Sequence, residues 1–206
     1  KGKGKGKGKG GEDEWNAPAE KELTKTGTTS EGTDVSVAAA ALLAKCKKEP
    51  QAQQRLLASV AEKITAEPQQ ELELFDVFFQ LHSQGADTRT RQLALLSAIA
   101  VFKDLVPGYS IRETTEKEKQ VQRSKGVLSI EQYENAILQT YRKLLPLLEN
   151  ALRKSPGAMA PALAALVKAA SDFNLKQRLL WIAVKYANGA DIGARKVIVA
   201  GVRGRG

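Results

Sequence analysis

Apolar residues recur every three or four positions along most of the chain after residue 34, which is the spacing of the buried face of an α-helix. The links between these segments are short and rich in proline, glycine and other turn residues. The predicted helices cover residues 35–48, 51–66, 68–83, 88–106, 130–152, 162–170 and 173–187, and a last one follows Asp191. We therefore expect an all-α protein built as an irregular HEAT-like stack of antiparallel helical pairs, an α-solenoid.

Capping residues mark the expected helix starts. Four aspartates precede predicted helices and are good N-cap residues: Asp34, Asp87, Asp172 and Asp191. Ser129 and Gln132 form a capping box for the long helix. Asn188 and Gly189 are a typical C-terminal stop.

Prolines and the final residues predict interruptions. Pro146 lies inside the long helix, where it should cause a kink or a brief break. Residues 153–157 are predicted to form a loop, and Pro161 is suited to the first position of the helix that follows. The last helix, with Val197–Val199, is expected to have no packing partner.

The periodicity also predicts the core. The expected inward residues are Leu56, Leu57, Val60, Ala61, Ile64, Leu72, Phe75, Phe79, either Leu74 or Val77, then Leu95, Ile99, Phe102, Val106, Ile130, Tyr133, Ile137, Tyr141, Leu144, Leu148, Ala151, Leu163, Leu166, Val167, Leu179, Ile182, Ala183 and Tyr186. Cys46 is expected to be a small buried residue, and His82 to have a structural role.

A corner with several special residues follows the helix that ends near Val106. Pro107 should stop the helix, and Gly108 can adopt the left-handed conformation that turns the chain away. Beyond the stop, Tyr109 and Arg112 are of the residue types that anchor interfaces, so we predict that they face a partner. The alternative is that Tyr109 folds back over the helix end.

Two further residues of this corner, Lys103 and Asp104, are also candidates for partner contact. They are adjacent in sequence, so their side chains are expected to diverge on the helix and not to pair.

The formal net charge of +9 is unevenly placed. Residues 1–33 carry seven lysines against six acidic residues, and a glycine-lysine alternation opens the chain. This composition predicts a disordered tail, separate from a helical domain over 34–206. Five lysines of the tail are candidates for contact with a polyanion, although low-complexity drift explains them equally well: Lys1, Lys3, Lys5, Lys7 and Lys9.

Residues 110–126 are strongly charged and nearly free of apolar side chains. The segment is either a solvated crossover or becomes ordered on a partner, through residues such as Lys117 and Lys119. Residues 45–48 include three lysines, which suit a helix C-terminus and are also compatible with a short nuclear import signal.

The sequence offers little for catalysis. It contains one histidine and one cysteine, and its carboxylates are scattered over predicted helix surfaces. We therefore expect no enzyme, no metal, no cofactor and no small-molecule substrate. No apolar run is long enough to cross a bilayer, so no membrane association is expected.

The stretch Val101–Arg112, followed by Thr115–Glu118, resembles a signature of the nucleolar complex-associated protein 3 family: valine-phenylalanine-lysine-aspartate, two aliphatic residues, proline-glycine-tyrosine, a basic residue, isoleucine-arginine. Ser110 replaces the basic residue. The resemblance continues from about Arg55 to Tyr186, through Ile64–Pro68, Tyr133–Glu134 and Phe173–Asn174. Asp172 and Leu175 depart from the family's usual histidine and phenylalanine.

The resemblance implies a non-enzymatic nucleolar scaffold in biogenesis of the large (60S) ribosomal subunit. Such a protein supports ribosomal RNA processing and the intranuclear movement of precursor particles. Its implied partners are a nucleolar complex protein 2 homologue and pre-60S particles, in the nucleus and nucleolus. The alternative is a chromatin-associated adaptor in DNA replication initiation. Because family members continue for several hundred residues, we also expect a truncated chain or a partial gene model.

Overall fold

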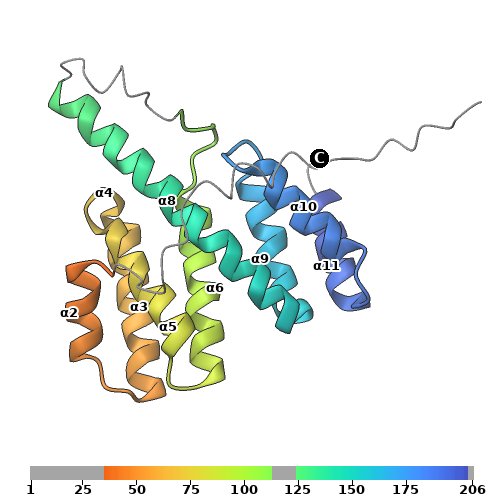
Figure 1. The fold of residues 1–206 in the computed structure, drawn as a ribbon, viewed down its shortest axis with the longest axis horizontal. Helices are drawn as coiled ribbons and strands as arrows, with labels where there is room; N and C mark the ends of the chain where they lie inside the picture. Colours follow the sequence, from red (N-terminus) through yellow and green to blue (C-terminus); the bar gives the residue numbers. More distant parts are fainter. Residues whose placement is uncertain (1–34, 113–123, 204–206) are drawn as a thin grey trace, which may run out of the picture. The chain divides into compact units, whose positions relative to one another are not determined.

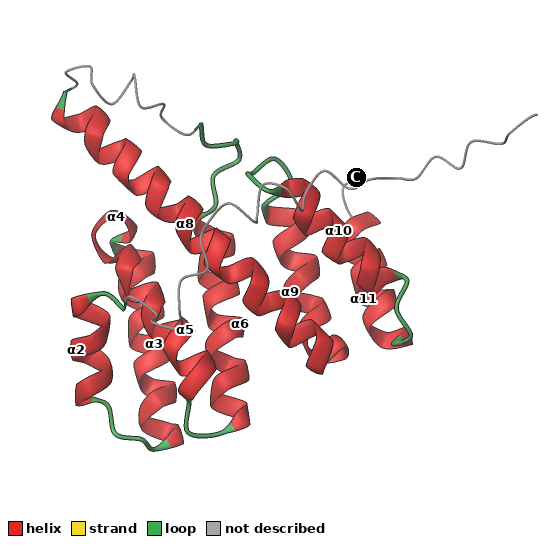
Figure 2. Ribbon diagram, viewed as in Figure 1, coloured by secondary structure: helices red, strands yellow, loops and turns green. Residues whose placement is uncertain are grey.

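The structure is a computed structural model that describes residues 35–112 and 124–203. The predicted disorder of residues 1–33 and the predicted cap Asp34 lie outside this part. Within it, all regular structure is helical and no strand occurs, which confirms the all-α prediction (Figure 2). The elements before residue 112 are α2 (Val37–Lys45), α3 (Pro50–Ala66), α4 (Pro68–Glu71), the 3-10 helix η1 (Leu72–Leu74), α5 (Phe75–Gln84) and α6 (Thr88–Leu105). Those after residue 124 are α8 (Lys125–Lys154), α9 (Pro156–Ala169), α10 (Lys176–Ala187) and α11 (Ile192–Arg203), with labels as in Figure 1.

Helices α2, α3, α5 and α6 pack side by side in the first part of the chain (Figure 1). The predicted cap Asp87 begins α6, since its carboxylate accepts a hydrogen bond from the Thr90 backbone N–H at 2.6 Å. The turn before it is fixed by Gln53, whose buried side chain accepts from the Ala86 N–H at 2.8 Å. The Gln53 contact therefore fixes the α5–α6 turn against α3.

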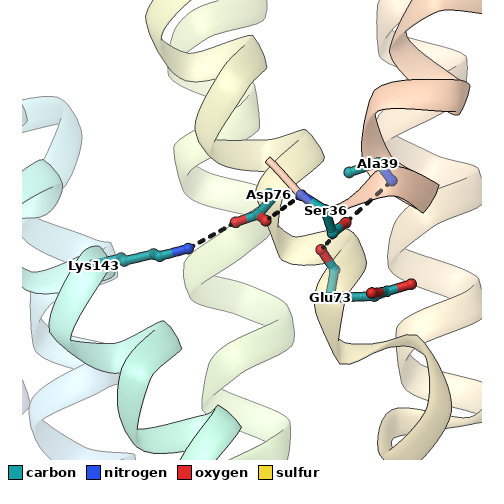
Figure 3. Close-up of polar contacts among 5 residues, drawn as sticks. All are labelled: Ser36, Ala39, Glu73, Asp76 and Lys143. Atoms are coloured by element: carbon teal, nitrogen blue, oxygen red, sulfur yellow. Dashed lines mark hydrogen bonds and ion pairs between the residues drawn. The ribbon is translucent and has the colours of Figure 1, made fainter. Parts of the chain in front are cut away.

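Ser36, and not Asp34, is the N-cap of α2 in the structure. Its hydroxyl accepts from the Ala39 N–H and donates to the Glu73 carbonyl, both at 3.2 Å (Figure 3). Its backbone N–H donates to one oxygen of Asp76 at 3.0 Å, and the other oxygen of that carboxylate pairs with Lys143 at 3.1 Å. Asp76 therefore links the start of α2 to α8 through α5.

The predicted helix over 68–83 is divided into α4, η1 and α5. This division turns both Leu74 and Val77 inward, where an unbroken helix would have buried one of them. Phe78, which the periodicity did not select, is fully buried, while the predicted Phe79 is half-buried. Cys46 is also only half-buried, although burial raises the pKa of its thiol.

Helix α8 is longer than predicted. It begins at Lys125 because Ser124, and not Ser129, provides the cap: the Ser124 hydroxyl accepts from the Val127 N–H at 3.4 Å. It continues through Pro146 without the predicted break. The predicted loop over 153–157 is a single residue, Ser155, between α8 and α9.

The prediction that Ile130 lies in the core is wrong. This residue is exposed, because residues 124–130, which include the first turns of α8, are all exposed. Tyr133 and Ala151 of the same predicted face are half-buried.

Helix α9 consequently starts at Pro156, and the predicted first residue Pro161 lies inside it. Helix α10 starts at Lys176 and not at Phe173, because Leu175 adopts a left-handed conformation (φ 59°) that interrupts the helical path. Asp172 therefore caps no helix. Asp191 does begin α11 as predicted, since its carboxylate accepts from the Ala194 N–H at 2.8 Å.

Helix α11 has a partner, contrary to prediction, because it packs closely on α9. Small residues allow the approach: a Cβ atom placed on Gly201 would lie 2.5 Å from the Cβ of Ala164. Ala194 and Ile198 are buried in the same helix. The periodicity revealed the apolar face of α11 but not the small residues that let α9 cover it.

We expect the substitution Gly201→Val to lower the free energy of unfolding by about 1–3 kcal/mol, because the added methyl groups would force α9 and α11 apart. The free energy of unfolding can be measured by urea denaturation followed by circular dichroism. The control is Gly126→Val in the first turn of α8, where a Cβ meets no atom within 4 Å. Equal stability of the two variants would show that α11 does not pack on α9 as described.

Six aromatic rings form the centre of the core: Phe75, Phe78, Phe79, Phe102, Tyr141 and Phe173. The rings of Phe102 and Tyr141 are stacked, with centroids 5.1 Å apart and planes 5° from parallel. Burial raises the pKa of the Tyr141 phenol. Phe102 also contacts Phe75 and Phe173, so this residue of α6 connects α5, α8 and the segment before α10.

Candidate interaction site

The candidate site is the corner at the end of α6, residues 103–112. Pro107 ends the helix as predicted: Val106 is the C-cap (φ −63°, ψ 126°), and its N–H donates to the Phe102 carbonyl at 2.9 Å. Val106 is half-buried. Gly108 does not adopt the predicted left-handed conformation, since no described glycine has a positive φ. Because Pro107 stops the helix, no such glycine conformation is needed there.

Ile111 fixes the far end of the corner. Its side chain is buried, and its backbone makes two hydrogen bonds with the side chain of Asn174 in the segment before α10. The Ile111 N–H donates to Asn174 Oδ1 at 2.7 Å, and Asn174 Nδ2 donates to the Ile111 carbonyl at 2.8 Å. The side-chain amide of Asn174 thus acts as both acceptor and donor for the Ile111 backbone, as the peptide groups of an adjacent chain segment would.

Sequence reasoning missed this role of Asn174. Ile111 is an apolar residue next to a charged segment, and Asn174 has an amide side chain that can bond to a backbone. Nothing in the sequence indicated that these two residues pair, because they lie 63 positions apart.

Tyr109 projects between these two fixed points. Its side chain is 55% exposed, and its hydroxyl donates to Glu134 Oε1 on α8 at 2.6 Å. This hydrogen bond raises the pKa of the Tyr109 phenol, because it favours the protonated form. The tyrosine is directed to α8 and not over the end of α6, and much of its ring stays open to solvent.

The other predicted contact residues are exposed where the structure describes them. Lys103 and Asp104 form an ion pair, with Nζ and Oδ1 3.0 Å apart, so the prediction that they diverge is wrong. The lysine side chain is long enough to bend back to its neighbour. Arg112 is exposed at the end of the described corner. Lys117, Lys119 and the five N-terminal lysines lie outside the described residues.

The corner provides an exposed phenol and charged side chains, which are groups that can bind a partner. Across the described parts of the chain, no three histidine, cysteine, aspartate or glutamate residues are grouped to hold a metal ion. His82, as predicted, makes a structural contact, since its Nδ1 lies 2.9 Å from the Arg91 carbonyl and must donate to it. No helix in residues 35–112 or 124–203 is long and apolar enough to span a membrane.

Residues 35–112 and 124–203 form an all-helical fold, and the corner is a surface with an exposed tyrosine and a pair of opposite charges. Comparison with known families gives a more specific result: residues 52–144 match the model of the family described as Nucleolar complex-associated protein. The match covers α3 to the middle of α8 and includes the whole corner.

Individual relatives agree with this match. Nucleolar complex-associated protein 3 of Schizosaccharomyces pombe is 31% identical over 136 residues, which are 61% of this chain and 18% of that protein. The protein of the same name from Arabidopsis thaliana is 29% identical over 172 residues, 80% of this chain and 21% of its own length. The protein of the same name from Saccharomyces cerevisiae is 31% identical over 104 residues, which are 45% of this chain and 16% of that protein.

Residues 52–144 therefore belong to the nucleolar complex-associated protein family, which confirms the resemblance noted in the sequence. The chain spans about a fifth of the length of the relatives from Schizosaccharomyces pombe and Arabidopsis thaliana.

Proposed function

We propose that this chain is a non-enzymatic nucleolar scaffold that takes part in biogenesis of the large ribosomal subunit. The observation that supports this most is the family match over residues 52–144, together with relatives from yeasts and a plant whose names place them in a nucleolar complex. The partners implied by the resemblance are a nucleolar complex protein 2 homologue and pre-60S particles. The chain would act on ribosomal RNA processing and on the intranuclear movement of these particles.

The physical properties of the chain are compatible with a scaffold. Closely packed helices with short links provide stable surfaces for several partners and require no catalytic groups. A HEAT-like continuation of these helical pairs would extend that surface. The net charge of +9 favours encounters with ribosomal RNA, whose phosphates carry the opposite charge.

Within this function, the corner is the proposed partner contact. Tyr109 offers a half-open aromatic ring whose hydroxyl is already held by Glu134, so little conformational freedom is lost on binding. Arg112 lies three residues away, beyond the buried anchor Ile111. The anchors at Phe102 and Ile111 fix the backbone on both sides, and a fixed backbone positions a contact residue better than a free loop does.

The test is the double variant Tyr109→Ala with Arg112→Ala, expressed with an affinity tag. We expect its melting temperature to stay within about 3 °C of the parent, because both side chains are exposed. Recovery of the nucleolar complex protein 2 homologue and of pre-60S particles should fall at least about tenfold, which corresponds to the loss of one interface anchor.

The matched control is Gln51→Ala with Arg55→Ala on α3, which also removes two exposed side chains, one of them an arginine. A stable corner variant that recovers both partners as well as the control does would contradict the proposed contact. Retention on duplex DNA and not on precursor particles would instead support the chromatin-associated alternative, which no described contact favours.

A further inference from the structure

A second surface, formed by α10 and α11, is apolar and exposed. The side chains of Trp181 and Val184 are 56% and 58% exposed, and three other large apolar residues of the two helices are also exposed: Leu180, Ile192 and Val197. Leu180, Val184 and Ala187 follow one another at i, i+4 and i+7, so they share one face of α10. Isolated exposed apolar residues are ordinary, but a group of this size on two adjacent helices indicates an interaction surface.

The same two helices carry a one-sided charge. Between Lys176 and Arg203 the sequence contains six basic residues: Lys176, Arg178, Lys185, Arg195, Lys196 and Arg203. The single acidic residue in this stretch is Asp191, whose carboxylate already caps α11. The apolar surface is therefore accompanied by a net positive charge that no carboxylate of α10 or α11 offsets.

An open groove joins the two properties. It has a volume of about 410 Å³, and Ala187, Val199 and Ala200 provide small apolar lining residues. The other lining residues are Arg195, Lys196 and Arg203, and no acidic side chain lines the groove. Because Ala187 shares its face of α10 with Leu180 and Val184, the exposed apolar strip leads into the groove.

We propose that this surface, formed by Leu180, Val184 and Ala187 of α10 and the groove residues of α11, binds an acidic amphipathic helix of a partner protein. Such a helix places its apolar face in an apolar groove and its carboxylates against flanking cations. The small side chains at Ala187 and Ala200 permit a close approach of a helix backbone. The surface would bind such a helix in any compartment, so its test is independent of the nucleolar function.

Single-stranded RNA fits the surface less well. RNA would use the cations and stack bases on Trp181, but Lys185 already lies over that ring, 4.8 Å from its centroid. Lys185 is held there by an ion pair with Glu149 at 3.3 Å. RNA phosphates would also not contact the exposed apolar side chains of Leu180 and Val184, whereas the apolar face of an amphipathic partner helix would cover them.

The probe is a synthetic 18-residue peptide with leucines at i, i+3, i+4 and i+7 and glutamates on both flanks. In the full chain with Trp15→Phe, the fluorescence of Trp181 next to the surface reports binding. We expect a change in emission and a Kd between about 1 and 100 μM, which corresponds to a moderate binding free energy for one helix on an open surface. A peptide with lysines in place of the glutamates should bind at least about tenfold more weakly because its charges are repelled.

Two protein variants test the charged and the apolar parts of the interaction separately. Arg195→Glu with Lys196→Glu, and separately Val184→Asp, should each weaken peptide binding at least about tenfold, since both alter exposed residues that contact the peptide. The matched control, Lys47→Glu with Lys48→Glu beside α2, makes the same charge change elsewhere and should weaken it less than about twofold. Circular dichroism verifies that all variants remain folded.

Three results would overturn the proposal. The first is no binding of the acidic peptide at about 1 mM, tenfold above the weakest Kd expected. The second is an equal loss of peptide affinity in the control and in the α11 variant. The third is saturable binding of single-stranded RNA with quenching of Trp181 while the peptide does not bind.

Discussion

The substitution Phe102→Ala is expected to lower the free energy of unfolding by about 3–5 kcal/mol. Phe102 is fully buried, and its ring stacks on Tyr141 and contacts Phe75 and Phe173 at their edges. Truncation would leave a cavity where α5, α6, α8 and the segment before α10 meet, and the surrounding rings cannot all collapse into it. A domain of this size has a total stability of only about 5–15 kcal/mol, so much of it would be lost.

Two comparisons make this result specific. Leu93→Ala, on the exposed side of α6, should cost less than about 1 kcal/mol. Phe102→Leu should fall between the two, because it keeps part of the buried volume. Urea denaturation measures all three. A loss at Phe102→Ala no larger than that at Leu93→Ala would mean that the aromatic residues do not form the described core.

The second largest effect is expected for Asn174→Ala, which should lower the free energy of unfolding by about 2–4 kcal/mol. The change removes both hydrogen bonds to the backbone of Ile111 and leaves one N–H and one carbonyl next to a buried side chain without their partner. A buried polar group without a hydrogen-bond partner costs about 1–3 kcal/mol. The two backbone groups of Ile111 are only partly buried, so we expect the lower part of this range for each.

Hydrogen exchange gives the diagnostic readout for this pair. The Ile111 amide should exchange slowly in the parent and at least about tenfold faster in Asn174→Ala, since its acceptor is gone. Asn174→Asp keeps the acceptor but loses the donor, so it should protect the amide better than alanine does. The control is Asn135→Ala on the exposed side of α8. Unchanged exchange at Ile111 in Asn174→Ala would show that the corner is not held by Asn174.

Most helices could be predicted from apolar spacing, but several of their ends could not. Asp87 and Asp191 cap helices as expected, because each directly precedes an apolar-periodic segment. Ser124 and Ser129 are both suitable caps, and the sequence alone favoured the later one because of its partner Gln132. Asp172 failed since the following residues reach the left-handed Leu175 before a helix can form.

Tertiary packing explains the unbroken path of α8. Pro146 removes one backbone hydrogen bond, yet Leu144, Leu145 and Leu148 around it are fully buried. Their burial stabilises the helix by more than the missing hydrogen bond costs. Rules based on the local sequence do not include this tertiary contribution. The contact of α11 with α9 was missed for a similar reason, because Gly201 and Ala164 carry too little apolar surface to appear in a periodicity.

The corner was predictable in part. The stop at Pro107, the burial of Phe102 and the exposure of Tyr109 all follow from the local sequence. The ion pair of Lys103 and Asp104 depends on lysine side-chain conformation, and the pairing of Ile111 with Asn174 depends on the tertiary fold. Only the second of these depends on residues far apart in the sequence.

The proposed role of this chain, in the nucleolus on precursors of the large ribosomal subunit, can be tested in cells. The most direct measurement is sucrose-gradient sedimentation of nucleolar extract from cells that express the tagged chain, with large-subunit precursor RNA quantified in each fraction. We predict that the chain sediments with this RNA, and that the variant Tyr109→Ala with Arg112→Ala moves to the light fractions while the α3 control stays. Sedimentation of the parent chain in the light fractions alone, or its recovery with chromatin and not with precursor RNA, would contradict the proposed function.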